Sequence, residues 1–456
     1  MRRQSTKILF LFLSLSLAGT ALPSEAFSAD TAFDILKKYI VAQNQKSLEE
    51  SLKDGSHRGE AGILRIRPEP AKALGMKVFV DQDYAEAKAL LKKAGISLAR
   101  AKAAMATGKK EESPDAHAKR MVRHVLAYKA KKGKSRDKLR AYYSRLTPRN
   151  DDRLVRAAGE KALDRLLKEC LKKHQNRLRD ALGHLYNYCL DENAHTLTPK
   201  NIHFVNGVFY AFVREAKKTD LAGFHLDRVS DYGTKGTSGD WKKILGTVTP
   251  GYVAPLEKAI KKHGNKRYPV DPLLFMALMR RESLFDPRAV SYVGAAGLTQ
   301  IMPKTGKDLG MEHIFMPAYF DDAVTLFKEE RRLKRQAVRV LLRINDENGL
   351  DQAKRARALK QKGMGLERKR KRLFARYRKE LLNRKRDERL QPENAITFGY
   401  KYFGALMRQQ KGPHRIKQYQ GIPPFEETVL FRNKVLEFYR EYLKKAGEKR
   451  QVGSGR

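Results

Sequence analysis

The residue best placed for catalysis is Glu282, because the sequence puts its carboxyl group among apolar neighbours. Residues 271–285 favour a helix that opens with Asp and Pro and ends ahead of the next proline. On that helix Glu282 stacks on Leu278 and Met279, one turn back. Apolar surroundings raise the pKa of a carboxyl group toward the operating pH, as a general acid requires. A glutamate near a helix end is more often only solvated, or paired with an arginine such as Arg281.

The residues that follow, 289–305, combine a tight turn with neutral hydrogen-bonding side chains. Gly294 and Gly297 lie three apart, and such glycines let the backbone approach a ligand closely. Ser291 and Gln300 offer a hydroxyl and an amide, which suit sugar hydroxyls and N-acetyl groups. A general acid beside these groups predicts a carbohydrate-binding cleft.

This segment closely resembles the soluble lytic transglycosylase (SLT) domain, glycoside hydrolase family 23. The family pattern is Glu-Ser-x-Phe-x-Pro-x-Ala-x-Ser-x-x-Gly-Ala-x-Gly-Leu-x-Gln-x-Met-Pro-x-Thr, and every fixed position is matched from Glu282 to Thr305. The resemblance implies an all-α, lysozyme-like catalytic domain. It also implies that Ser291, Gln300 and Met302 line the sugar subsites.

The resemblance further implies the reaction, cleavage of the bond between N-acetylmuramic acid and N-acetylglucosamine in peptidoglycan. Glu282 would protonate the leaving oxygen and then act as a base while the muramyl 6-hydroxyl closes on its own anomeric carbon, giving a 1,6-anhydro sugar. One carboxylate suffices because the substrate's N-acetyl group supports the charge and no water is activated, whereas ordinary glycosidases use two. Asp286 is expected only to shape the turn before Pro287.

Two later segments extend the resemblance, which covers residues 253–320 and 391–443. Residues 389–402 look like the family's Pro-x-x-Asn-Ile-x-x-Gly-x-x-Tyr helix, and residues 422–428 resemble its Ile-Pro-Phe-x-Glu-Thr segment. Glu427 is the matching acid and a candidate substrate contact. An acid at that position also suits a helix N-terminus for electrostatic reasons alone.

One departure concerns a tyrosine whose hydroxyl reaches the catalytic glutamate in the family. The family reads Ala-Ala-Tyr-Asn-Ala-Gly-Pro between these two segments, whereas residues 408–413 read Arg-Gln-Gln-Lys-Gly-Pro. Tyr419 or Tyr402 could take its place. Two interpretations therefore stay open, an active transglycosylase and a peptidoglycan-binding scaffold with impaired turnover.

The rest of the chain predicts further helical units around this catalytic part. Helical patterns recur at 84–105, 163–190 and 198–217, and the aromatic residues of the last are expected to pack in a core. We expect a signal peptide at 1–26, a separate helical accessory domain at 27–228, a linker at 229–250, the transglycosylase domain at 251–320 and 391–445, a basic helical insertion at 321–390 and a basic tail at 446–456.

The charge of the chain predicts an acidic partner. Lys and Arg number 95 against 51 Asp and Glu, a formal net charge of +44 at pH 7. Arg2 and Arg3 precede an apolar stretch and small residues, which is typical of an export signal and indicates the periplasm or another part of the cell envelope. We therefore expect peptidoglycan strands and anionic envelope surfaces as partners, and no nucleic acid, since no nucleic-acid-reading motif is found.

Two features leave narrower expectations. The insertion at 321–390 holds 24 Lys or Arg against 11 Asp or Glu, which fits either a solvated helical hairpin or a basic face that clamps an acidic polymer.

One continuous helix at 163–190 would hold Cys170 and Cys189 roughly 28 Å apart, which is too far for a disulfide. Buried free thiols are therefore expected unless the helix breaks near Gly183. No metal-ligand spacing or phosphate loop occurs, so no metal or other cofactor is expected.

Overall fold

A computed structural model describes residues 29–106, 113–216, 221–226, 240–265, 270–384, 386–408 and 421–453. The expected signal peptide, Tyr419 and residues 409–413 lie outside this part of the chain. The protein is all-α, as predicted: the described residues form α-helices and short 3₁₀-helices, with only isolated β-bridges between loops. No helix among them is both long enough and apolar enough to cross a membrane.

Residues 29–226 form an N-terminal lobe whose core lies among four helices. On α8 the aromatic residues Phe204, Phe209 and Phe212 are buried, as expected, while Tyr210 is exposed. Helix α8 packs on α2, and α7 packs on α6. The elements of this lobe outside its long hairpin are α2 (Ala29–Lys53), α3 (Pro68–Ala73), η1 (Asp152–Leu154), α6 (Arg156–Lys173), α7 (Leu178–Cys189) and α8 (Ile202–Glu215).

The single helix predicted at 163–190 is wrong, because the chain breaks between α6 and α7. Gln175 and Asn176 have φ angles of 52° and 57°, in the left-handed region, so the break falls before Gly183. Cys170 and Cys189 then stand on different helices within one core cluster. Both are buried free thiols, as predicted, although not for the reason given. Burial raises the pKa of Cys170 to about 12.

Residues 240–453 form a C-terminal lobe around the apolar helix α11, whose Phe275 is fully buried. The expected linker is wrong for residues 240–250, since these form α9 and η3, with Trp241 and Leu245 in the core. The expected tail is also helical as far as Gly453. The elements are α9 (Asp240–Val248), η3 (Pro250–Tyr252), α10 (Val253–His263), α11 (Pro272–Ser283), α12 (Pro303–Leu309), η4 (Glu388–Leu390), α15 (Pro392–Arg408) and α17 (Glu426–Gly453).

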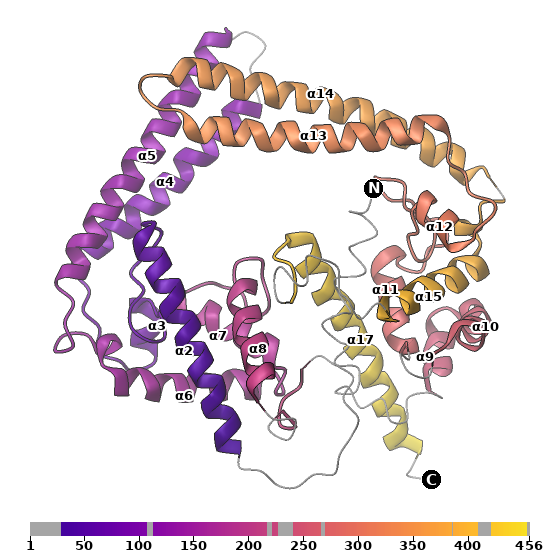
Figure 1. The fold of residues 1–456 in the computed structure, drawn as a ribbon, viewed down its shortest axis with the longest axis horizontal. Coiled ribbons are helices and arrows are strands. Elements are labelled where there is room, and N and C mark those ends of the chain that lie inside the picture. Colours follow the sequence, from indigo (N-terminus) through magenta and orange to yellow (C-terminus); the bar gives the residue numbers. More distant parts are fainter. Residues whose placement is uncertain are drawn as a thin grey trace.

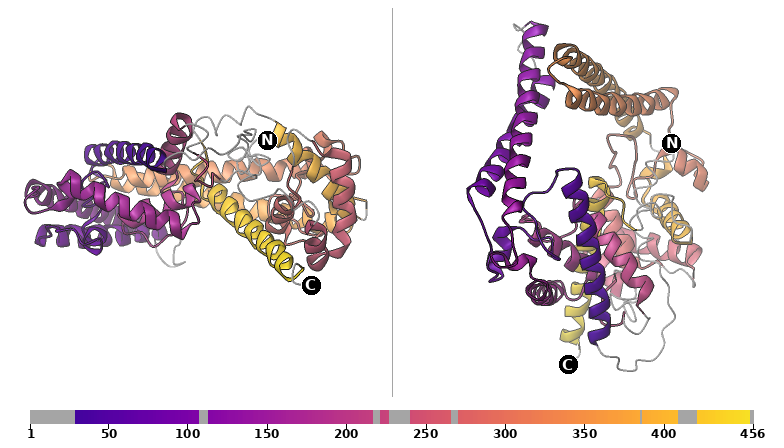
Figure 2. Two further views of the ribbon diagram at one scale, coloured as in Figure 1. Left: turned by 90° about the horizontal axis from the view of Figure 1, so that it is seen from below. Right: turned by 60° about the vertical axis from the view of Figure 1, so that its left-hand side comes forward.

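Each lobe sends out one long helical hairpin, and the two hairpins meet (Figure 1). The N-terminal hairpin consists of α4 (Gln82–Ala106) and α5 (Pro114–Ser144), and the expected basic insertion forms the other, α13 (Ala318–Arg343) and α14 (Gly349–Leu382). Their tips share an apolar cluster that includes Met105 and Met121 from one hairpin and Ala337 and Leu341 from the other. Away from the hairpins, α17 packs on α11 and runs between α8 and α11 in the view of Figure 1. Figure 2 shows α17, in yellow, from two further directions.

Candidate active site

Glu282 opens on a cleft of about 680 Å³ in the C-terminal lobe. Three elements line it: the end of α11, the loop that follows, and α17. One side of the cleft is formed by the motif around Glu282, and the other side is formed by a segment about 150 residues further along the chain. The lining residues are Arg281, Glu282, Ser283, Leu284, Ala289, Val290, Ser291, Gln300, Leu430, Lys434 and Phe438.

Helix α11 is held rigidly behind Glu282 because its body is a core element. The side chain of Asp271 caps the helix by accepting a hydrogen bond from the Leu274 backbone N–H at 3.0 Å. Every residue from Leu273 to Met279 is buried. Glu282 sits in the last turn and is half-buried, so it leaves the core surface at the point where the cleft begins.

The turn after Glu282 is tightly specified. Leu284 and Phe285 both have positive φ angles, 54° and 65°, which cost side-chain-bearing residues conformational energy. The Ser283 hydroxyl supports them, since it donates to the carbonyl of Met279 at 3.1 Å and accepts from the Phe285 N–H at 3.1 Å. Asp286 accepts from the Arg288 N–H at 2.8 Å, which is the turn-shaping position expected for it.

Ser291 and Gln300 lie together on the loop wall of the cleft, and both also brace the loop. The Ser291 hydroxyl oxygen accepts from the Ala295 N–H at 2.9 Å. The Gln300 side-chain amide donates to the carbonyls of Ala289 at 3.0 Å and Gly297 at 2.9 Å. This leaves the Gln300 carbonyl oxygen without a hydrogen bond among the described residues, so it is available to an amide or hydroxyl donor on a ligand.

A buried ion pair supports this loop from behind. Arg389 and Asp387 are both fully buried, and the guanidinium group donates to the carboxylate through Nε at 3.0 Å and Nη2 at 2.8 Å. Arg389 also donates to the Tyr377 hydroxyl at 2.8 Å. Gly297 lies so close to the Arg389 carbonyl that a Cβ there would come within 1.6 Å of its oxygen. Only glycine therefore fits the second of the two motif turns.

The wall formed by α17 was missed by the sequence analysis. Leu430, Lys434 and Phe438 are spaced four residues apart, so they share one face of the helix. The Lys434 ammonium group lies 4.7 Å from the centroid of the Phe438 ring. This four-residue spacing directly follows the family-like segment at 422–428, and it could have indicated that α17 lines the cleft.

Met302, Glu427 and Tyr402 are not among the described residues that line the cleft. Met302 precedes α12 and packs against a separate aromatic cluster. Glu427 is exposed in the first turn of α17, just before the lining residue Leu430. Tyr402 is half-buried on α15, and no tyrosine is among the described residues that line the cleft. Tyr419 lies outside the described residues.

Comparison with known proteins agrees with this geometry. Residues 259–324 match the family model of the transglycosylase SLT domain. The chain contains an SLT domain. The match covers α11, the loop and α12, and ends at the base of α13.

The curated relatives of the chain carry transglycosylase names. The chain is 36% identical over 74 residues to membrane-bound lytic murein transglycosylase C of Glaesserella parasuis, which is 14% of this chain and 20% of the relative. It is 49% identical over 45 residues to the protein of the same name from Actinobacillus pleuropneumoniae, 10% of this chain and 12% of the relative. It is 43% identical over 51 residues to the transglycosylase of Enterobacteria phage PRD1, 11% of this chain and 19% of the relative.

These relationships are local. The chain spans a fifth or less of the length of the curated relatives cited. No solved structure gives a significant match.

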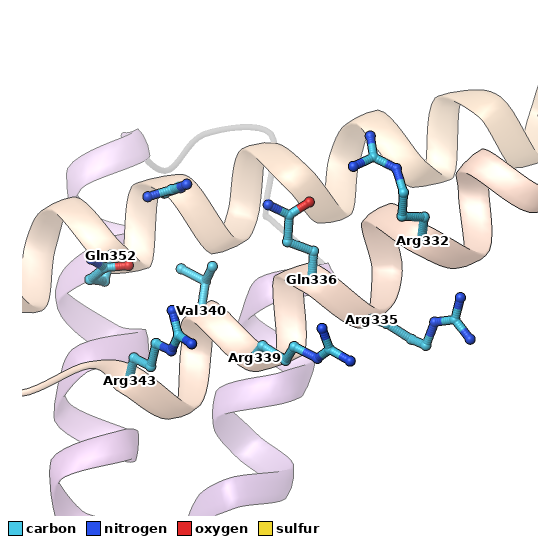
Figure 3. Close-up of a pocket in the computed structure, with 8 residues that line it drawn as sticks. Arg332, Arg335, Gln336, Arg339, Val340, Arg343 and Gln352 are labelled. Atoms are coloured by element: carbon cyan, nitrogen blue, oxygen red, sulfur yellow. The ribbon is translucent and has the colours of Figure 1, made fainter.

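A second pocket, of about 430 Å³, lies on the α13–α14 hairpin (Figure 3). Arg332 pairs with Glu329. The other arginines of the pocket, Arg335, Arg339, Arg343 and Arg355, have no ion pair or hydrogen bond within the part of the chain that the structure describes. Five of the eight lining residues are arginines, so the pocket is strongly basic. The residues lining it are Arg332, Arg335, Gln336, Arg339, Val340, Arg343, Gln352 and Arg355.

Proposed function

We propose that the protein is a peptidoglycan lytic transglycosylase of the cell envelope, with Glu282 as its acid and base. The observation that carries the proposal is that Glu282, Ser291 and Gln300 line one cleft within the SLT domain. Two of the relatives named above are membrane-bound lytic murein transglycosylases and the third is a transglycosylase, which supports the same chemistry. Peptidoglycan glycan strands are the proposed substrate.

The proposed reaction needs only one carboxyl group. Glu282 is the one carboxyl residue among the described residues that line the cleft. It would protonate the oxygen between N-acetylmuramic acid and N-acetylglucosamine, and the resulting carboxylate would remove the proton from the muramyl 6-hydroxyl as that oxygen bonds to C1. The products are a 1,6-anhydro end and a free N-acetylglucosamine end, and no water is consumed. An inverting or retaining hydrolase would need a second carboxylate across the cleft.

The other walls offer complementary contacts to such a substrate. Arg281 and Lys434 place two cationic groups at the cleft, suited to the carboxylates of the muramyl peptide stems. Leu284 is 76% exposed and, with Phe438, provides apolar surface for sugar faces and N-acetyl methyl groups. The Gln300 carbonyl oxygen is free to accept from an N-acetyl N–H.

Digestion of isolated peptidoglycan tests the proposal. The full chain and its Glu282→Gln variant are incubated with the polymer, and the released fragments are analysed by mass spectrometry. Fragments lighter by one water than lysozyme products support the proposal, and Glu282→Gln should abolish them. Ordinary reducing ends would identify a hydrolase. If wild-type protein binds the polymer but releases nothing, the alternative of a binding scaffold with impaired turnover replaces the enzyme.

We also propose that the arginine pocket on the α13–α14 hairpin draws the exported protein to anionic envelope surfaces. The formal charge of +44 and the unpaired Arg335, Arg339 and Arg343 support this. Because each cationic residue near an anionic membrane contributes about 1 kcal/mol, reversing these three to Glu should weaken binding to anionic vesicles roughly 100-fold or more. Reversing Lys92, Lys93 and Lys102 instead, with the same change in net charge, is the control. Equal losses in both variants would assign the attraction to net charge alone.

A further inference from the structure

The N-terminal lobe contains a second set of the interactions that brace the loop beside Glu282. Arg153 and Asp151 are fully buried, with the guanidinium donating through Nε at 2.8 Å and Nη2 at 2.7 Å, as in the pair formed by Arg389 and Asp387. Arg153 also donates to the Tyr142 hydroxyl at 2.6 Å, the counterpart of Tyr377. Two buried, fork-shaped ion pairs with the same third partner are too specific for coincidence.

The surroundings of the two tyrosines also correspond. Tyr142 stacks on Phe79 at an interplanar angle of 12° and donates to its carbonyl at 3.1 Å. Tyr377 stacks on Phe315 at 12° and donates to its carbonyl at 3.1 Å. In each lobe the aspartate of the ion pair accepts from the N–H of the same phenylalanine.

The glycine turns match as well. Gly62 has φ of 69°, and a Cβ there would come within 1.8 Å of the Arg153 carbonyl oxygen; the values for Gly297 and Arg389 are 77° and 1.6 Å. The bridge between Ala61 and Ile66 repeats as the one between Ala296 and Ile301. In both lobes this turn is followed by a short helix, a long hairpin, a 3₁₀-helix and a further helix.

The sequence carries the same repeat. When residues 56–76 are placed on residues 291–311 without a gap, ten of the 21 positions are identical, including Ala-Gly-x-x-x-Ile-x-Pro and Leu-Gly-Met. Ahead of each stretch stands Glu-Ser-Leu, with Glu50 six residues before Ser56 and Glu282 nine residues before Ser291. Both glutamates lie near the C-terminal end of a helix, α2 and α11, so Glu50 is the counterpart of Glu282 in the repeat.

The two lobes contact each other reciprocally. Asn206 on α8 donates to the carbonyl of Ile422 at 2.6 Å and accepts from its N–H at 3.1 Å, just before α17. Asn433 on α17 donates to the carbonyl of Leu197 at 2.9 Å, just before α8. Together with the meeting of the hairpin tips, these contacts are those of a pseudo-symmetric pair of lobes, like the two-fold interface of a dimer.

We infer that the N-terminal lobe is a second, catalytically silent SLT-type lobe, whose role is to position α17 as the far wall of the Glu282 cleft. Its own glutamate, Glu50, is exposed, and Arg65 stands where the C-terminal lobe has Gln300. The lobe retains the bracing around Arg153 and Asp151 and its contacts with α17. This inference rests on the proposed function only in assigning turnover to Glu282.

Asp180 on α7 is at the centre of the contacts between the N-terminal lobe and α17. Its side chain is 7% exposed, and its carboxylate pairs with Arg440 of α17 at 2.9 Å and, more distantly, with the buried Arg432 of α17 at 3.8 Å. Arg177 completes the cluster at 3.2 Å. Burial alone would raise the pKa of Asp180, but the three guanidinium groups hold it below its usual value. The same helix carries Leu430, Lys434 and Phe438 on the cleft side.

Ile422 and Val429 add apolar contact to these ion pairs, because both are fully buried in the core cluster of the N-terminal lobe. The cleft wall is thus anchored in a core that belongs to the other lobe. We assign Asp180 as a positioning residue for substrate binding, not as a catalytic residue.

Asp180→Asn in the full chain tests the inference, with Glu169→Gln, in an exposed ion pair of the same lobe, as the matched control. Hydrogen exchange should show faster exchange in residues 421–440 for Asp180→Asn only. With solubilised glycan strands, KM should rise about tenfold and kcat should change less than twofold. Asp180→Glu, which keeps the charge, should restore part of the loss. Arg440→Gln is a milder second variant if Asp180→Asn fails to fold.

Two results would overturn the inference. Unchanged exchange and unchanged KM in Asp180→Asn and Arg440→Gln would remove the positioning role. A loss of turnover in Glu50→Gln as large as that in Glu282→Gln would mean that the N-terminal lobe is itself active. If no variant or wild-type protein cleaves glycan, the proposed function fails, while the hydrogen-exchange arm still decides whether the N-terminal lobe holds α17.

Discussion

In the C-terminal lobe Glu282 is half-buried and opens on a cleft, whereas in the N-terminal lobe its counterpart Glu50 is exposed at the end of α2. The bracing behind the two positions is nevertheless the same, down to the buried pairs of Arg389 and Arg153 with their aspartates. The comparison separates two sets of residues. The buried bracing pairs occur in both lobes, whereas the glutamate opens on a cleft in the C-terminal lobe only among the described residues.

The largest difference between the lobes should appear in turnover. Glu282→Gln removes the proton donor and should lower kcat about 1,000-fold, since general acid catalysis typically contributes 10²- to 10⁴-fold. Glu50→Gln should leave kcat within twofold of wild type. Release of anhydro fragments from peptidoglycan measures both. Comparable losses in the two variants would break the distinction drawn here between an active and a silent lobe.

The two buried ion pairs should be equally important for stability. Arg389→Met and Arg153→Met each leave a buried aspartate without its partner, at a cost of roughly 3–5 kcal/mol in the free energy of unfolding. Hydrogen exchange of each lobe separates the two effects. Arg376→Met, which breaks an exposed pair with Glu380, is the control and should cost about 0.5 kcal/mol. If Arg153→Met lowers the free energy of unfolding much less than Arg389→Met, the two buried ion pairs are not equivalent.

Glycine substitutions separate steric contact from backbone conformation. Gly297→Ala and Gly62→Ala force a methyl group against a backbone carbonyl at positive φ, and should each cost about 3 kcal/mol or more. Gly310 and Gly75 also have positive φ, of 96° and 79°, but open space around them, so alanine there should cost about 1 kcal/mol. Thermal unfolding of the four variants measures the difference. Equal costs at all four sites would contradict the close approach seen at the loop.

Acid should weaken the N-terminal lobe first. His184 is buried between two other histidines, with ring nitrogens 3.1 Å from the buried His174 and 3.2 Å from the exposed His195. Burial, and then the charges of Lys173 and the two other histidines, lowers the pKa of His184 to about 4. Because the unfolded chain then binds more protons than the folded one, stability is full above about pH 6.5 and falls as pH drops toward 4, on the order of 2 kcal/mol.

Hydrogen exchange at pH 7 and pH 5 checks this pH dependence. His184→Gln, which does not titrate, should flatten the response of the N-terminal lobe. If the C-terminal lobe loses protection first, the histidine chain is not the acid-sensitive element.

The sequence predicted the near walls of the cleft well because they are local. Residues 271–305 hold their own cap, turn glycines and hydrogen-bond partners, so Glu282, Ser291 and Gln300 meet through short-range structure. The sequence-based prediction was wrong where a local pattern fitted more than one structure. The apolar spacing of residues 163–190 fits one helix, and nothing in it reveals that Gln175 and Asn176 adopt the left-handed conformation.

The repeat between the lobes was visible in the sequence but was not recognised. Half of the ten identical residues are glycine, alanine or proline, which are common in turns and loops of any protein, and a hairpin of more than 50 residues separates them from their ion pair. Only the folded chain shows that Gly62 and Arg153, or Gly297 and Arg389, touch.

The sequence by itself predicted the all-α class and the SLT motif and singled out Glu282 as the candidate acid, because each depends on residues close together in the chain. The tertiary structure decided which surface faces Glu282. The far wall, Leu430 to Phe438, and its anchor at Asp180 are brought to the motif from about 150 residues after it and 100 before it. Pairing of buried charge holds that arrangement, because the buried carboxylate of Asp180 is paired with Arg440 and Arg432 of α17 as well as with Arg177.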